Sequence, residues 1–121
     1  IFTDKQLANL FAELNFRLKL FMPGSNGLQQ ALVANGGQKV VGSITTAIGG
    51  PWDVCGVKLV LNAGGAARAF SVYSDPDTPP FLEERNPLDV MSYDILVCGN
   101  SQETVDSLVT YLPLEVVQLV E

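Results

Sequence analysis

The side chains that could carry out chemistry in this chain are two cysteines and a few acidic pairs, and the chain has no histidine. Without histidine there are no imidazole-based triads, no imidazole acid–base catalysis and none of the most common zinc ligand. Cys55 and Cys98 occur singly in apolar stretches, without the spacing of a zinc or CxxC redox motif and with no basic residue directly beside them to activate a thiolate. We therefore expect two buried free thiols in a reducing compartment, with pairing between neighbouring strands as the open alternative.

The acidic residues do not match a known catalytic or metal-binding pattern either. Asp75 and Asp77 lack the further spaced ligands and the terminal glutamate of a calcium loop. Glu83 and Glu84 lie in a segment expected to be solvated, where the acidity of a carboxyl group stays ordinary. We predict no catalytic residue, no metal site and no cofactor, and we expect a protein that is not an enzyme.

The glycine pair Gly64-Gly65 lies within residues 57–73, VKLVLNAGGAARAFSVY, and could belong to a ligand loop or to a hairpin turn. With the pair as a two-residue turn, Val57 lies opposite Val72 and the apolar side chains of both strands share one side of the ribbon. A phosphate cradle would need these glycines between a strand and a following helix. The pattern therefore predicts a central β-hairpin with its tip at the glycine pair.

Local patterns predict the other elements of a single α+β domain spanning residues 1–121, with a mostly antiparallel sheet and a C-terminal β-α-β unit. Thr3 and Gln6 have the spacing of a capping box at the start of an amphipathic helix. Residues 16–22 favour a strand, although continuation of this first helix is the alternative. Helices are predicted over residues 4–14, 28–34 and 101–112, and further strands over residues 38–48, 93–98 and 115–120.

Residues 74–91, SDPDTPPFLEERNPLDVM, are predicted to form one long loop. Structureless loops beyond roughly 12 to 15 residues are uncommon in compact domains unless they bind something or are disordered. Four prolines stiffen this segment, which lowers the entropic cost of ordering it against a partner. We interpret it as a partner-contacting arm, with a solvated connector as the alternative.

The composition points to protein partners. Charged residues make up 17% of the chain, below the roughly 25% of typical soluble domains, and the mean hydropathy is +0.24. We therefore expect surplus apolar side chains on the surface, where they mark an interface. The net charge of −6 and the scattered basic residues argue against nucleic-acid and membrane-surface partners, and no apolar run reaches the roughly 20 residues of a membrane span.

The order of these parts resembles that of the tail-terminator and tail-completion proteins of long-tailed phages. The helix "FTDKQLANLFAEL" precedes a central hairpin and a long loop, and "YDILVCGNSQETVDSLVTYL" then forms a strand that runs into a helix. The resemblance is closest over the last third of the chain and is architectural elsewhere. It implies a ring, commonly a hexamer, that is assembled in the host cytoplasm and caps the tail tube in the virion. Its partners would be copies of itself and other neck or tail proteins, and outside a virion the location would be cytoplasmic.

Such a ring would make its contacts through the loop and through the hairpin tip. One hypothesis pairs Arg68 or Arg85 of one copy with Glu83 or Glu84 of the next. The rival function is a small ferredoxin-like dimeric domain that binds a ligand or regulates, with its pocket at the strand end near Gly99 and Asn100. The predicted interface residues are Asp75, Pro79, Pro80, Phe81, Leu82, Glu83, Glu84 and Arg85 in the loop, with Gly64, Gly65 and Arg68 at the hairpin tip.

Overall fold

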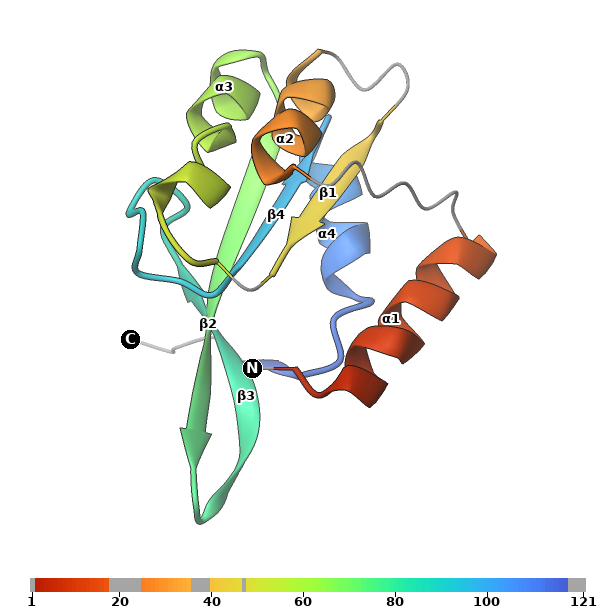
Figure 1. Cartoon of the computed structure of the whole chain (residues 1–121), viewed down its shortest axis with the longest axis vertical. Coiled ribbons are helices and arrows are strands. Elements are labelled where there is room, and N and C mark those ends of the chain that lie inside the picture. The colour runs from red at the N-terminus through yellow and green to blue at the C-terminus, as the bar shows by residue number, and fades with distance from the viewer. Residues whose placement is uncertain (1, 18–24, 36–39, 47, 118–121) are drawn as a thin grey trace.

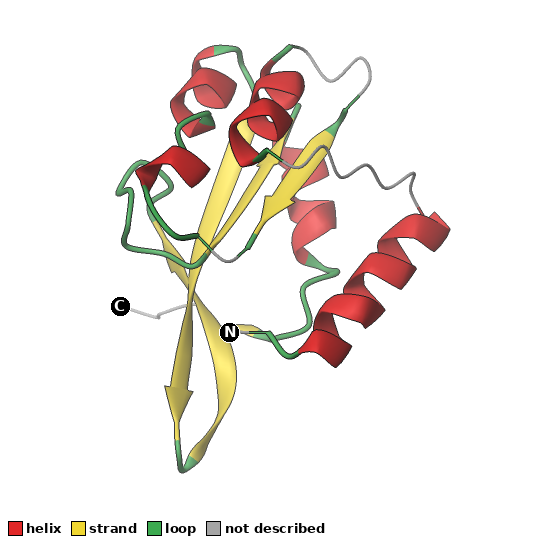
Figure 2. Ribbon diagram, viewed as in Figure 1, coloured by secondary structure: helices red, strands yellow, loops and turns green. Residues whose placement is uncertain are grey.

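The computed structural model describes residues 2–17, 25–35, 40–46 and 48–117 of the 121-residue chain. These residues form the α+β fold that the sequence predicts, with helices packed against one five-stranded sheet (Figure 2). The elements in chain order are α1 (Asp4–Arg17), α2 (Asn26–Ala34), β1 (Gly42–Thr45), η1 (Pro51–Asp53), α3 (Val57–Asn62), β2 (Ala66–Asp75), β3 (Thr78–Arg85), β4 (Ile95–Gly99), α4 (Gln102–Val109) and β5 (Val116–Val117).

The strand order in the sheet is β1-β4-β2-β3-β5. Neighbouring strands are antiparallel except β3 and β5, which are parallel. Strand β4 lies between β1 and β2, and all five of its residues are buried. Strands β4 and β5 run in the same direction but are separated by β2 and β3, so the predicted C-terminal β-α-β unit does not join neighbouring strands.

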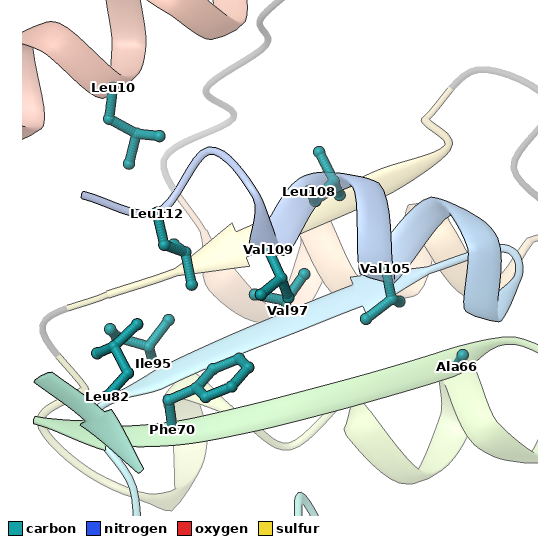
Figure 3. Packing of buried hydrophobic residues seen from close by; sticks show 10 residues of the cluster. All are labelled: Leu10, Ala66, Phe70, Leu82, Ile95, Val97, Val105, Leu108, Val109 and Leu112. Carbon is teal, nitrogen blue, oxygen red and sulfur yellow. The ribbon is translucent and has the colours of Figure 1, made fainter. Parts of the chain in front are cut away.

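Helices cover both faces of the sheet, with α2 and α3 on one side and α4 on the other (Figure 1). Alternate residues of β4 point to opposite faces, as the pleat of a strand requires. Ile95 and Val97 pack on the α4 side with Phe70 and Leu10 of α1 (Figure 3). Leu96 and Cys98 pack on the α2 and α3 side. Strand β4 therefore supplies residues to two separate hydrophobic clusters.

The predicted starts of α1 and α4 are confirmed by side-chain hydrogen bonds. The Thr3 N–H donates to Gln6 Oε1 at 2.9 Å and the Gln6 N–H donates to Thr3 Oγ1 at 3.1 Å, which completes the capping box of α1. The Ser101 hydroxyl caps α4 by accepting from the Thr104 N–H at 3.2 Å. Ser25 caps α2, which therefore begins earlier than the predicted residue 28.

Three predicted strands differ in extent. Helix α1 continues to Arg17, so the predicted strand over residues 16–22 is wrong at its start, and residues 18–22 lie outside the described part of the chain. Strand β1 covers only Gly42–Thr45 of the predicted residues 38–48. Strand β5 covers Val116–Val117, and residues 118–120 of the predicted strand are not described.

The predicted hairpin over residues 57–73 is wrong, because Val57–Asn62 forms the helix α3. The glycine pair ends this helix. Gly64 adopts φ +89, its N–H donates to the carbonyl of Leu61, and the Gly65 N–H donates to that of Val60. This is the Schellman arrangement, in which a glycine takes the left-handed conformation after the last helical turn. Over only six residues the apolar pattern fits a strand and a short helix equally well, so periodicity did not separate the two.

The predicted long loop over residues 74–91 is also wrong, because most of it belongs to a β-hairpin. Strand β2 continues to Asp75, and β3 begins at Thr78 after a turn at Pro76 and Asp77. The register shifts between Tyr73 and Asp75, opposite the start of β3. A strand tolerates prolines at such an irregularity and where it lacks a second neighbour. Prolines that predicted a loop are therefore accommodated in a two-stranded ribbon.

Candidate functional site

The end of the β2–β3 hairpin, residues 73–81, projects from the body of the protein, and we call it the arm (Figure 1). Its position follows from where the neighbouring strands stop. Strand β2 pairs with β4 only as far as Phe70, which lies opposite Ile95. Strand β3 first pairs with β5 at Leu82. Between these points the two strands pair only with each other, so neither edge of the arm is paired with another strand of the described sheet.

The arm is held in shape by contacts among its own residues. The rings of Tyr73 and Phe81 face each other across the two strands, with their centroids 4.8 Å apart. Asp75 organises the turn, because its Oδ1 accepts from the Asp77 N–H at 2.9 Å and its Oδ2 accepts from the Tyr73 hydroxyl at 3.3 Å. A cross-strand aromatic pair stabilises a ribbon by roughly 0.2–1 kcal/mol. The arm is therefore pre-shaped without support from the hydrophobic clusters.

The surface of the arm is apolar and acidic. The Tyr73 residue is 42% exposed, Pro79 and Pro80 are exposed, and Phe81 is half-buried. Asp75 and Asp77 provide its charge, and residues 73–81 contain no lysine or arginine. Rigid aromatic and proline side chains with a few charges are suited to contact with another protein, because little conformational entropy is lost on docking.

Near the base of the arm, Arg68 and Arg85 form three ion pairs within the chain. Arg68 forms two hydrogen bonds to Glu84, at 2.7 and 2.9 Å, and its NH1 group lies 3.2 Å from Asp106. The hydrogen bond to Glu84 holds the pKa of Arg68 above its ordinary value. Arg85 bonds to Glu83 at 3.2 Å and to the Ser71 hydroxyl at 3.0 Å. Arg68 and Arg85, which were predicted to pair with carboxylates of a second copy, thus have carboxylate partners in their own chain.

The predicted interface residues fall into four groups. Asp75, Pro79, Pro80 and Phe81 lie together on the arm. Glu83, Glu84, Arg85 and Arg68 lie at or near its base, on β2 and β3. Gly64 and Gly65 lie at the start of β2, the opposite end of the strand from the arm, and so they are not a hairpin tip. Leu82 is fully buried in the α4-side cluster, which excludes it from direct contact with a partner.

The two cysteines differ in environment and are both free. Cys98 is buried in the centre of β4, as predicted, and burial raises the pKa of its thiol to about 12. Cys55 is exposed, so the prediction of a buried thiol is wrong at this position. It lies in the turn between η1 and α3, where its thiol bonds to the carbonyl of Trp52 at 3.3 Å. The raised pKa of Cys98 keeps its thiol protonated, which is the opposite of what activates a nucleophile.

The strand end that the rival function would use as a pocket is filled by contacts of the chain itself. Gly99 is buried, and a Cβ there would meet Val105 of α4 at 2.8 Å. The Asn100 N–H donates to the carbonyl of Val41 at 2.8 Å, and the Asn100 side chain accepts from the Thr104 hydroxyl at 2.7 Å. These contacts occupy the space beside Gly99 and engage the N–H and the side-chain oxygen of Asn100.

The sequence motifs do not indicate which apolar side chains away from the arm are exposed. The most exposed of them is Trp52 on η1, the only tryptophan of the chain, which is 69% exposed. Its position after Gly49-Gly50-Pro51, in a turn-forming sequence, was the available signal for exposure. The others in the described part of the chain are Phe11, Leu28, Val41, Leu59, Leu88, Val90, Met91 and Val117.

Metal and membrane sites are not found in the residues that the structure describes. No group of three cysteine, aspartate or glutamate side chains in these ranges is placed to hold a metal ion. None of the helices formed by these residues has the length and apolar character to cross a bilayer. No family model, curated protein or solved structure matches the chain. The geometry of the arm therefore carries the functional argument.

Proposed function

We propose that this protein is a non-enzymatic structural subunit that assembles with copies of itself through the arm. The observation that supports this function is the projection of residues 73–81 beyond the body, with Tyr73 and two prolines exposed. An isolated two-stranded ribbon is at best marginally stable in water. A partner that covered the arm would stabilise it by burying its apolar surface.

The free energy expected from burying the apolar side chains of the arm favours contact with a protein over exposure to solvent. Burying a large apolar side chain contributes roughly 1.5–3 kcal/mol. Within a single copy, the rings of Tyr73 and Phe81 pack against each other, and the exposed part of Tyr73 obtains none of this gain. The net charge of −6 would oppose association of copies, and the short apolar arm concentrates the favourable contact at one place.

The class of assembly that we propose is the ring of a phage tail terminator or tail-completion protein at the head–tail junction. The support is the order of parts: an opening amphipathic helix, a projecting hairpin, and a buried strand that leads through a serine-capped turn into a helix. The hairpin lies at β2 and β3, later in the chain than the sequence predicts. In this assembly the subunit would contact its own copies, commonly six in all, and neck or tail proteins of the virion.

The number of copies tests this function directly. Sedimentation velocity over a wide concentration range should show an oligomer larger than a dimer. The double substitution Tyr73→Ser/Phe81→Ser should shift the population toward the monomer, because it removes the aromatic pair of the arm. Leu88→Ser is the control, since Leu88 is an exposed apolar residue outside the arm. A wild-type chain that stays monomeric at every concentration would rule the function out.

A further inference from the structure

A second exposed surface lies on the segment between β1 and β2, and we call it the η1–α3 face. It is defined by Trp52, which is 69% exposed, by Leu59, which is 52% exposed, and by the exposed Lys58. The indole of Trp52 lies against the backbone of Gly50, because a Cβ added there would overlap the ring. One side of the ring is therefore supported by the chain while much of the residue stays open to solvent.

The η1–α3 face is fixed in place by buried polar contacts. Gln30 of α2 is fully buried, and its Nε2 donates to the Asp53 carbonyl while its Oε1 accepts from the Gly56 N–H, both at 2.8 Å. The Asp53 carboxylate accepts from the Gly49 N–H at 2.8 Å and from Asn26 at 3.0 Å. These two bonds, the first more than the second, hold the pKa of Asp53 below its ordinary value. A surface held this firmly loses little entropy when a partner binds.

Lys58 on the η1–α3 face and the acidic residues of the arm carry opposite charges, and the Asp53 carboxylate of η1 is already bonded to Gly49 and Asn26. Lys58 is the only charged residue of α3. The arm carries Asp75 and Asp77 and no basic residue. The side chain of Asp75 is engaged in the turn, whereas Asp77 is exposed at its tip. Such pairing steers encounter and sets the register of a contact.

The two surfaces cannot meet within one copy. Helix α3 lies at one end of the long axis of the molecule and the turn of the arm lies at the other (Figure 1). A contact between them must therefore join two copies. A contact between unlike surfaces is heterologous, and it closes into a ring when the rotation between copies allows it.

We propose that the η1–α3 face is the surface that receives the arm of a second copy, with Asp77 against Lys58 and the arm's aromatic and proline residues against Trp52 and Leu59. This inference rests on the proposed self-assembly and adds the receiving surface to it. Tryptophan is the residue most enriched at the energetic centres of interfaces. An exposed tryptophan that is supported by Gly50, with an exposed lysine on the helix that follows, fits an aromatic and acidic ribbon.

The single tryptophan allows the contact to be followed by fluorescence in the unmodified chain. As the concentration rises and the oligomer forms, the emission maximum of Trp52 should move to shorter wavelength because the indole leaves water. Asp77→Lys should move this transition to higher concentration. An oligomer that forms without any change in Trp52 emission would overturn the inference and leave self-assembly standing. A chain that never associates would instead overturn the proposed function.

A charge swap tests the pairing itself. Lys58→Glu and Asp77→Lys should each weaken association by about tenfold, and the double variant should recover most of the loss. Lys5→Glu is the matched control, because it makes the same charge change on α1 and should leave association unchanged. The pairing would be contradicted if Lys5→Glu weakened association as much as Lys58→Glu does. It would also be contradicted if the double variant lost as much affinity as the two single variants combined.

Cross-linking supplies a readout that does not depend on any variant. A zero-length carbodiimide reagent joins an amine to a carboxylate only where the two are in contact. We expect a peptide that links Lys58 to Asp77 in the assembled wild-type chain, and the separation of α3 from the arm means that it joins two copies. Links from the arm carboxylates to other lysines, with none to Lys58, would overturn the proposal.

Discussion

Strands β2 and β3 run through both the body of the protein and its arm, but different contacts stabilise the residues of the two parts. Within the body, Phe70 of β2 and Leu82 of β3 are fully buried between sheet and helix (Figure 3). A few residues further along, Tyr73 and Phe81 contact mainly each other. The change occurs where β4 and β5 stop pairing with β2 and β3. Neighbouring strands and covering helices, rather than residue type, therefore decide whether an aromatic residue supports the fold or remains available for a partner.

Along one hairpin, the residues in the body stabilise the fold, and the residues in the arm are available for assembly. Regions with few buried apolar contacts open at low free-energy cost, whereas core strands open only with global unfolding. Neither hydrophobic cluster of the described residues includes an arm residue, and Val72, directly before the arm, packs against the α4-side cluster. Substitutions in the arm should therefore change assembly with little effect on folding, and substitutions in the body should do the reverse.

The largest expected effect is that of Phe70→Ala. Removing a fully buried phenylalanine leaves a cavity and costs about 3–5 kcal/mol of unfolding free energy. Phe81→Ala, on the next strand but in the arm, should cost less than about 1 kcal/mol, the scale of a cross-strand pair. Urea unfolding followed by circular dichroism measures both, at concentrations where the chain is monomeric. Similar costs at the two positions would remove the distinction between body and arm.

A smaller but clear effect is expected for Gln30→Leu. The substitution leaves the Gly56 N–H and the Asp53 carbonyl buried without Gln30 as their partner, which costs roughly 1–3 kcal/mol. Gln29→Leu is the control, since Gln29 is half-buried and makes one bond of 3.3 Å, to the Ile44 carbonyl. Unfolding of the two variants in urea should show the larger loss for Gln30. An equal or smaller loss would mean that Gln30 does not anchor the η1–α3 segment.

The body should also lose stability at alkaline pH. Burial raises the pKa of Cys98 from 9.0 to about 12, and burial together with the nearby Cys98 and Asp89 raises that of Tyr93 from 10.0 to about 12. In the unfolded chain both groups release their protons at lower pH than in the native one. The native state then binds more protons than the unfolded state above pH 9, so the unfolding free energy falls as the pH rises from about 9 toward 12.

Unfolding in urea at several pH values between 8 and 11 measures this slope. Cys98→Ala should remove part of it, whereas Cys55→Ala, at an exposed thiol, should leave it unchanged. Stability that stayed level or rose over this range would contradict buried, protonated side chains at Cys98 and Tyr93.

Elements with strong local signals could be predicted from the sequence. Two of these signals are helix caps that act within a few residues: the capping box of Thr3 and Gln6, and the serine cap of α4. The third is the continuous apolar run of β4, which is typical of a strand buried on both faces. The α3 segment could not be assigned in this way, because its six residues fit two periods and the decision came from packing against β2 and β4. Pro79 and Pro80 predicted a loop, and the strand that contains them exists because β2 is its partner there.

The candidate site was predictable only in part. Composition and prolines indicated that Asp75, Pro79, Pro80 and Phe81 belong to a stiff exposed segment, and the structure places them on the arm. The ion pair of Arg68 with Glu84 depends on strand register, which local sequence does not determine.

The most direct test of assembly through the arm is to remove the arm and measure the molar mass of the protein in solution. Replacing residues 73–81 with Asn-Gly would close β2 and β3 through a two-residue turn between Val72 and Leu82, which already face each other. Light scattering should find an oligomer for the wild-type chain and a monomer for the shortened one, with nearly the same urea midpoint when both are monomeric. A shortened chain that keeps the wild-type mass would contradict assembly through the arm.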